Sequence, residues 1–75
     1  MMAYKKILSE GIVDWGKHKG KTGLQIAQCD PGYLYWCVAN GVADVETVGE
    51  MSSLVVEWAG KNKREADKIL SRATR

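Results

Sequence analysis

The sequence predicts a small α+β domain, in which a β-hairpin is followed by three to four short helices. Two observations support this fold class: a β-prone, glycine-bracketed segment lies near the start, and apolar residues recur at three- and four-residue steps through the remainder. The chain has 75 residues, of which 45% are hydrophobic and 27% charged. This is enough for one folded unit, and we expect residues 1–75 to form a single domain.

The hairpin is predicted over about residues 12–22. A β-prone run comes first, and Gly16 and Gly20 then bracket Lys17-His18-Lys19. Glycine supplies the positive φ angles that tight turns need, so the three bracketed side chains are expected to point outward. The preceding segment, residues 4–8, fits either a further strand or a short helical turn.

The helices are expected over about residues 23–29, 31–39, 45–59 and 62–73. Thr22 and Gln25 have the spacing of a capping box, which starts the first helix. Asp30-Pro31 ends that helix, since the residue before proline is disfavoured in the α region, and supplies the N-cap and first residue of the second. Asn40-Gly41 is a C-terminal stop.

The third helix is expected to contribute a core stripe, with Asp44 as its N-cap and Gly60 as its stop. The stripe consists of Val48, Met51, Leu54, Val55 and Trp58. Asn62, with Glu65 three residues later, is expected to cap the last helix. One helix bent near Gly60 fits the final two elements equally well.

The aromatic residues divide into core and surface candidates. Because the chain has no Phe, its tryptophans, Trp15, Trp36 and Trp58, are expected in the core. Tyr33 is expected to pack locally beside the helix cap. Tyr35 is as well suited to stacking on a base as to packing.

Charge is distributed unevenly around a net value of +2. Residues 1–23 and 61–75 have an excess of Lys and Arg, whereas residues 24–60 contain neither and include five carboxylates. If the two ends meet in the fold, one face is basic and can attract phosphate or an acidic protein surface. The alternative is solvated charge that keeps the protein soluble.

Part of the sequence resembles a known family. The resemblance lies in Trp-Gly-Lys-His-Lys-Gly-Lys-Thr at residues 15–22, Leu24 and Ile26, and Asp-Pro-Gly-Tyr-Leu-Tyr-Trp at residues 30–36. These residues resemble the small domain at the C-terminal end of exodeoxyribonuclease X-like proteins. They also resemble a family of small, free-standing bacterial and phage proteins, the quorum-sensing-regulated virulence factors. The resemblance implies an accessory domain associated with nucleic acid, and it does not imply nuclease activity.

The candidate binding residues are mainly basic. Lysines of the hairpin and basic residues at helical spacing in the last helix are suited to phosphate, and an aromatic ring can stack on a base. The predicted nucleic-acid-binding residues are Lys17, His18, Lys19, Lys21, Tyr35, Arg64, Lys68 and Arg72. We expect a cytoplasmic, non-catalytic module that binds DNA or RNA weakly and without sequence specificity. The alternative is a protein-interaction module, phage-encoded or not, that modulates a nuclease or other nucleic-acid enzyme.

Other function classes have little support in the sequence. His18 is the only histidine, and no motif places a base beside a Ser or Cys, so we expect no enzyme. His18, Cys29 and Cys37 do not have the close pair spacing of a zinc site, so we expect no metal or cofactor. We expect the two cysteines to be reduced thiols. No membrane span or signal peptide is expected. A homodimer is compatible with either function.

Overall fold

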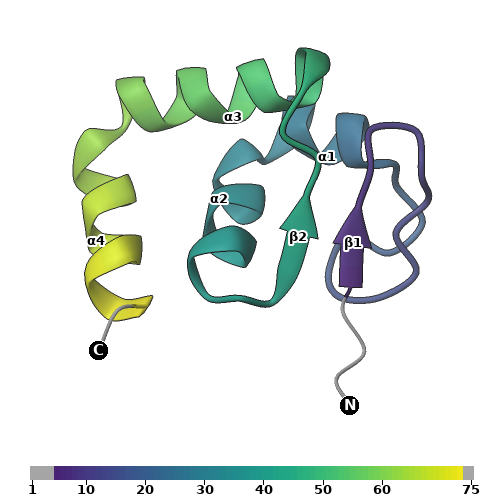
Figure 1. Ribbon diagram of the computed structural model, residues 1–75, viewed down its shortest axis with the longest axis horizontal. Coiled ribbons are helices and arrows are strands. Elements are labelled where there is room, and N and C mark those ends of the chain that lie inside the picture. The colour runs from purple at the N-terminus through teal and green to yellow at the C-terminus, as the bar shows by residue number, and fades with distance from the viewer. Residues whose placement is uncertain (1–4, 74–75) are drawn as a thin grey trace.

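The computed structural model describes residues 5–73, which form a two-stranded sheet and four helices (Figure 1). The strands are β1 (Lys5–Ile7) and β2 (Ala43–Val45), and the helices are α1 (Gly23–Cys29), α2 (Pro31–Ala39), α3 (Gly49–Lys61) and α4 (Lys63–Ala73). The predicted α+β class is therefore confirmed. No helix within residues 5–73 combines the length and the hydropathy that a membrane crossing requires.

The segment before the loop is a strand, the first of the two alternatives that the sequence allows. β1 pairs with β2 in parallel, with Lys5 opposite Ala43 and Ile7 opposite Val45. The backbone N–H of Glu46 donates to the Ile7 carbonyl at 3.0 Å, which extends the pairing by one bond. Ile7 is fully buried. Tyr4, which belongs to the same predicted segment, lies outside the described residues.

The segment predicted as a hairpin, residues 12–22, is closed by a single antiparallel bridge rather than by two regular strands. The bridge joins Ile12 and Thr22 at the base of the loop. Gly16 and Gly20 have φ angles of +76° and +94°, which other residues rarely adopt, so the two glycines turn the chain as predicted. We call residues 16–20 the glycine loop.

Helices α1 and α2 have the bounds predicted from their caps. Thr22 Oγ1 accepts a hydrogen bond from the Gln25 N–H at 3.2 Å, and Gln25 Oε1 accepts one from the Thr22 N–H at 2.8 Å. This is a complete capping box. Asp30 Oδ1 accepts from the Tyr33 N–H at 3.3 Å, and Pro31 is the first residue of α2.

Helix α3 begins later than predicted. The sequence indicated residues 45–59 with Asp44 as N-cap, but residues 43–45 pair with β1, and Asp44 lies in the middle of β2. The N-cap position is Val48, which has no capping side chain and is 67% exposed, so it is not part of the core stripe. Gly49, with a φ of +86°, redirects the chain from the sheet into the helix.

The last two helices are separate, and the break lies at Asn62 rather than Gly60. The side-chain amide of Asn62 donates to the Trp58 carbonyl at 2.9 Å. Asn62 was expected to cap the start of α4, but its side chain instead bonds to the end of α3, at a carbonyl that also accepts the Asn62 backbone N–H at 2.8 Å. The chain then turns sharply into α4 (Figure 1).

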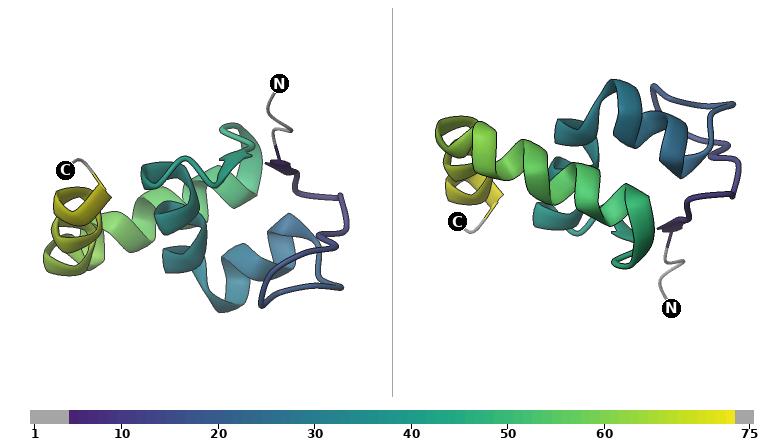
Figure 2. Two further views of the ribbon diagram at one scale, coloured as in Figure 1. Left: turned by 90° about the horizontal axis from the view of Figure 1, so that it is seen from below. Right: turned by 90° about the horizontal axis from the view of Figure 1, so that it is seen from above.

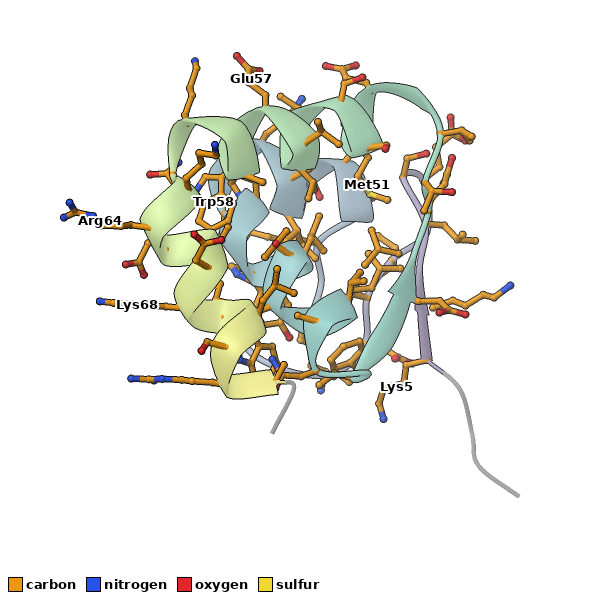
Figure 3. All side chains as sticks on the ribbon, turned by 60° about the vertical axis from the view of Figure 1, so that its left-hand side comes forward. Lys5, Met51, Glu57, Trp58, Arg64 and Lys68 are labelled. Atoms are coloured by element: carbon orange, nitrogen blue, oxygen red, sulfur yellow. The ribbon has the colours of Figure 1, made fainter. Side chains whose placement is uncertain are left out.

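The core is enclosed by β1, β2, α1, α2 and α3. Its largest fully buried side chains are Ile7, Ile26, Leu34, Cys37 and Met51. Met51 points into the interior from α3, and Trp58 points from the same helix towards α2 (Figure 3). The indole of Trp58 covers Gly32 so closely that a Cβ there would lie 2.9 Å from the ring. The glycine loop and α4 lie at opposite ends of the molecule with α2 between them (Figure 2).

Candidate nucleic-acid interface

Trp36 is exposed, contrary to the expectation that all three tryptophans lie in the core. Its exposed fraction is 42%, whereas Trp15 and Trp58 are half-buried. The reason is the helical spacing of α2. Leu34 and Cys37 form the buried side of this helix, so Trp36 lies off that stripe and faces outward.

Trp36 is the last ring of an aromatic column that starts in the glycine loop. The Tyr33 ring stacks on it, with ring centroids 6.1 Å apart and an interplanar angle of 21°. His18 meets Tyr33 edge-on at 4.8 Å. Lys17 Nζ lies 5.4 Å from the centroid of the same tyrosine ring, within the range of a cation–π contact. The column of His18, Tyr33 and Trp36 therefore joins the loop to the surface of α2.

Asp30 fixes the glycine loop against this column. Its Oδ2 atom lies 3.1 Å from His18 Nε2 and 3.5 Å from Lys17 Nζ. Burial raises the pKa of the Asp30 carboxyl, but the hydrogen bond with His18, the charge of Lys17 and the Tyr33 N–H together outweigh it. The pKa of Asp30 therefore lies below its ordinary value of 3.8.

His18 does not point outward as predicted. Only 13% of its side chain is exposed, because the imidazole packs between Asp30 and Tyr33. Its Nδ1 atom is buried without a hydrogen-bond partner. His18 therefore orients the loop and offers no free ring edge to a phosphate, unlike its neighbours Lys17 and Lys19, which are exposed.

Two cavities flank the Trp36 indole. One, of about 210 Å³, lies between α2 and α4 and is lined by Trp36, Asn40, Glu65, Lys68, Ile69 and Arg72. The other, of about 330 Å³, lies on the loop side and is lined by Lys17, Asp30, Tyr33 and Trp36. We call the first cavity the α2–α4 cleft. Trp36 thus has basic side chains on both sides, which come from opposite ends of the sequence.

The structure brings only some of the predicted binding residues to this surface. Lys17, Lys68 and Arg72 line the two cavities, and Lys19 and Lys21 are exposed on or beside the glycine loop. Arg64 extends from the outer side of α4, away from the body of the molecule (Figure 3).

Tyr35 lies elsewhere on α2, half-buried against Trp58, with ring centroids 5.7 Å apart. The exposed ring is Trp36 instead. The sequence contained the signal for this arrangement, because Leu34 and Cys37 are three residues apart and define a buried stripe that excludes Trp36.

The two thiols are free and differ in environment. Cys29 is exposed and Cys37 is buried. Burial raises the pKa of Cys37 above its ordinary value, although a hydrogen bond with the Tyr33 side chain opposes this. Burial likewise raises the pKa of Tyr33, and Cys37 adds to the rise. Both groups therefore stay protonated at neutral pH, and Cys37 is not an activated nucleophile.

Comparison with known proteins gives one match. Residues 14–41 match the family model of the exodeoxyribonuclease X-like C-terminal domain. The match covers less than half of the chain and includes the glycine loop, α1 and α2, but neither α3 nor α4. Neither the curated proteins nor the solved structures gave a significant match. The resemblance is thus confirmed over the segment that builds the aromatic column, which has the pattern of the exonuclease-associated domain.

Proposed function

We propose that this chain is a non-catalytic module that binds nucleic acid weakly and without sequence specificity, in association with a nuclease or another nucleic-acid enzyme. The observation that carries the proposal is the exposed indole of Trp36, which lies between Lys17 on one side and Lys68 and Arg72 on the other. The match to an exonuclease-associated domain supports the same class of partner.

The chemistry of this surface suits a phosphate backbone. Phosphate contacts fix the position of a nucleic acid without reading its sequence, so binding through lysine and arginine is not sequence-specific. Two carboxylates lie within the same surface: Asp30 pairs with Lys17 at 3.5 Å, and Glu65 lies 4.0 Å from Lys68. Because they offset part of the positive charge, we expect weak binding that depends strongly on salt.

Fluorescence anisotropy of labelled single- and double-stranded oligonucleotides across a salt series tests this proposal. The test variant is Lys17→Glu/Arg72→Glu. The control is Lys6→Glu/Lys61→Glu, which changes the net charge equally and uses exposed residues that line neither cavity beside Trp36.

We expect the test variant to lose about tenfold in affinity at low salt, and the slope of log K against log salt to fall by roughly 1.4 to 1.8, since two phosphate contacts are removed. The control should stay within about twofold to threefold of the wild type. The proposal is wrong if neither oligonucleotide binds at low salt, or if the control weakens binding as much as the test variant.

A protein-interaction module is the second candidate, and a groove lined by valines favours it. Val38 and Val56 are 55% and 68% exposed. They border a cavity of about 160 Å³ between α2, β2 and α3, which Val45 and Val55 also line. The chain from residue 40 to residue 60 contains four carboxylates and no Lys or Arg, so the groove suits a helix of the partner enzyme with an apolar stripe and basic flanks.

Calorimetric titration with a synthetic basic amphipathic helix tests this second function. The matched probe is an acidic helix with the same apolar residues. We expect binding of the basic helix that persists at high salt and is lost in Val56→Asp. Equal binding of both helices, or binding that survives in Val56→Asp, would contradict it, and concentration-dependent self-association would assign the groove to a second copy of the chain.

A further inference from the structure

We propose that the surface around Trp36 accepts single-stranded nucleic acid, with one unpaired base stacked on the Trp36 indole in the α2–α4 cleft. This inference rests on the proposed function, because it names the form of nucleic acid that the same surface takes. It is carried by three features of the site: the covered face of the indole, the composition of the cleft, and the orientation of α4.

The indole is fixed before any ligand arrives. The Tyr33 ring stacks against it at 6.1 Å, and Tyr33 is in turn fixed by His18 and by the cap hydrogen bond to Asp30. Trp36 is 42% exposed and borders both cavities. A ring that is already ordered loses little conformational entropy when a base stacks on it.

A duplex cannot use this surface in the same way. Bases in a double helix present only their edges to the grooves, because their faces are covered by neighbouring base pairs. A cleft with an aromatic wall offers stacking, which needs an uncovered base face. The exposed indole beside a cleft is therefore suited to an unstacked strand.

The polar residues of the cleft favour a base over a phosphate. The carboxylate of Glu65 lines the cleft and repels a phosphate, whereas it can accept a hydrogen bond from an N–H group of a base, such as N3–H of thymine. Asn40 uses its Nδ2 atom to donate to the Trp36 carbonyl at 2.9 Å, which leaves its side-chain oxygen able to accept. Lys17 and Arg72 would then contact the phosphates on either side of the stacked base.

The competing hypothesis is that the protein binds double-stranded nucleic acid through the outer side of α4. Arg64 extends from this side away from the body of the molecule (Figure 3) and lines neither cavity beside Trp36, so it is placed for contact with a duplex. A duplex would therefore depend on Arg64 and not on Trp36, and a single strand would show the opposite dependence. Substitutions of Trp36 and Arg64, which are both exposed, can therefore distinguish binding of a single strand from binding of a duplex.

The test compares three labelled probes of equal length across the same salt series: a single-stranded oligothymidine, a duplex, and a strand of abasic sites that retains the phosphates. The variants are Trp36→Ala, Trp36→Phe and Arg64→Glu. Circular dichroism and thermal unfolding confirm that each variant is folded. All three changes are at exposed side chains, so we expect the fold to be retained.

We expect the wild type to bind the oligothymidine about tenfold more tightly than the duplex or the abasic strand. Trp36→Ala should lose roughly tenfold for the oligothymidine alone, with its salt slope unchanged, because stacking on one base is lost and no phosphate contact is. Trp36→Phe should recover most of this loss.

Two results would overturn the inference while leaving the proposed function intact. One is equal binding of duplex and single strand with no effect of Trp36→Ala. The other is a larger loss in Arg64→Glu than in Trp36→Ala for every probe. Failure of all three probes to bind at low salt would instead remove the proposed function, and the inference with it.

Discussion

The glycine loop and α4 both bring basic side chains to the surface around Trp36, but they position them by different means. In the loop, Lys17 is positioned by a carboxylate from the junction of α1 and α2 and by the ring of Tyr33. In α4, residues 64, 68 and 72 follow one another at four-residue steps on a regular helix. The loop side depends on contacts between distant segments, whereas the helix side depends on local periodicity.

This difference predicts different sensitivity to change. A substitution that displaces the glycine loop should remove one half of the surface, because loop geometry depends on its packing partners. A substitution of the same kind in α4 should leave the arrangement of its basic residues intact. The following expected outcomes test this contrast, from the largest effect to the smallest.

Gly23→Ala should disrupt the base of the loop. A Cβ at Gly23 would collide with the Leu8 carbonyl and lie 2.7 Å from Met51 Sδ, and the Gly23 N–H already donates to that carbonyl at 3.1 Å. We expect a loss of about 3 kcal/mol in the free energy of unfolding, seen as a lower midpoint in thermal denaturation.

Gly60→Ala is the matched control for Gly23→Ala. Its Cβ would meet nothing within 4 Å, and it lies inside α3, so alanine should be neutral or stabilise the protein by up to about 1 kcal/mol. Equal destabilisation by both substitutions would show that close packing at Gly23 does not cause the loss of stability in Gly23→Ala.

The two basic segments can be compared by charge reversal. Lys17→Glu/Lys19→Glu/Lys21→Glu and Arg64→Glu/Lys68→Glu/Arg72→Glu change the net charge equally. We expect each to weaken oligonucleotide binding by about tenfold or more and to reduce the salt slope. An effect of only one triple, measured by anisotropy, would show that the ligand contacts only one end of the surface.

Thr22→Ala removes half of the capping box between the loop and α1. We expect a loss of about 1 kcal/mol in urea denaturation, because the Gln25 N–H loses its acceptor at 3.2 Å. Thr47→Ala is the control, since this threonine is exposed and outside any helix, and its change should stay within about 0.5 kcal/mol. An equal loss in the free energy of unfolding for Thr47→Ala would show that the loss in Thr22→Ala does not come from the helix cap.

The smallest expected effect is the pH dependence of Asp30. Its pKa is lower in the folded protein than the ordinary 3.8, so its ionised form stabilises the fold above about pH 4. That contribution is lost as the pH falls through the folded pKa. Because the carboxyl is partly exposed, we expect less than about 1 kcal/mol.

Urea denaturation of the wild type and Asp30→Asn at about pH 6 and about pH 2.5 measures this contribution. The wild type should be the more stable protein at the higher pH, and the difference should shrink at the lower one. Asp44→Asn, on the exposed side of β2, serves as the control. A difference that is independent of pH would show that the charge of Asp30 does not stabilise the loop.

The sequence predicted the elements whose signals are local. The bounds of α1 and α2 follow from Thr22, Gln25 and Asp30, whose side chains bond to backbone groups three residues away. No local pattern reveals that Lys5–Ile7 pairs with Ala43–Val45, because each strand has three residues and its partner is far along the chain. For this reason the predicted start of the third helix was wrong.

The same distinction applies to the candidate site. The lysines of the loop and the basic residues of α4 were found from composition and spacing. The inward orientation of His18 depends on Asp30, twelve residues away in sequence, and the exposure of Trp36 depends on which side of α2 packs against the core. The two glycines alone suggested that all the side chains between Gly16 and Gly20 face solvent. The contacts of His18 with Asp30 and Tyr33 turn its side chain inward instead.

The parallel pairing of β1 with β2 also has a consequence for the order of folding. No tight turn can join parallel strands, so β1 can pair only after the intervening loop and helices have brought β2 alongside it. The cost of closing so long a segment is met before the new bonds form. We expect β1 to join last in refolding and to open first in the native state, so that the backbone amide of Glu46, which donates to the Ile7 carbonyl at 3.0 Å, exchanges with solvent faster than those in the middle of α2.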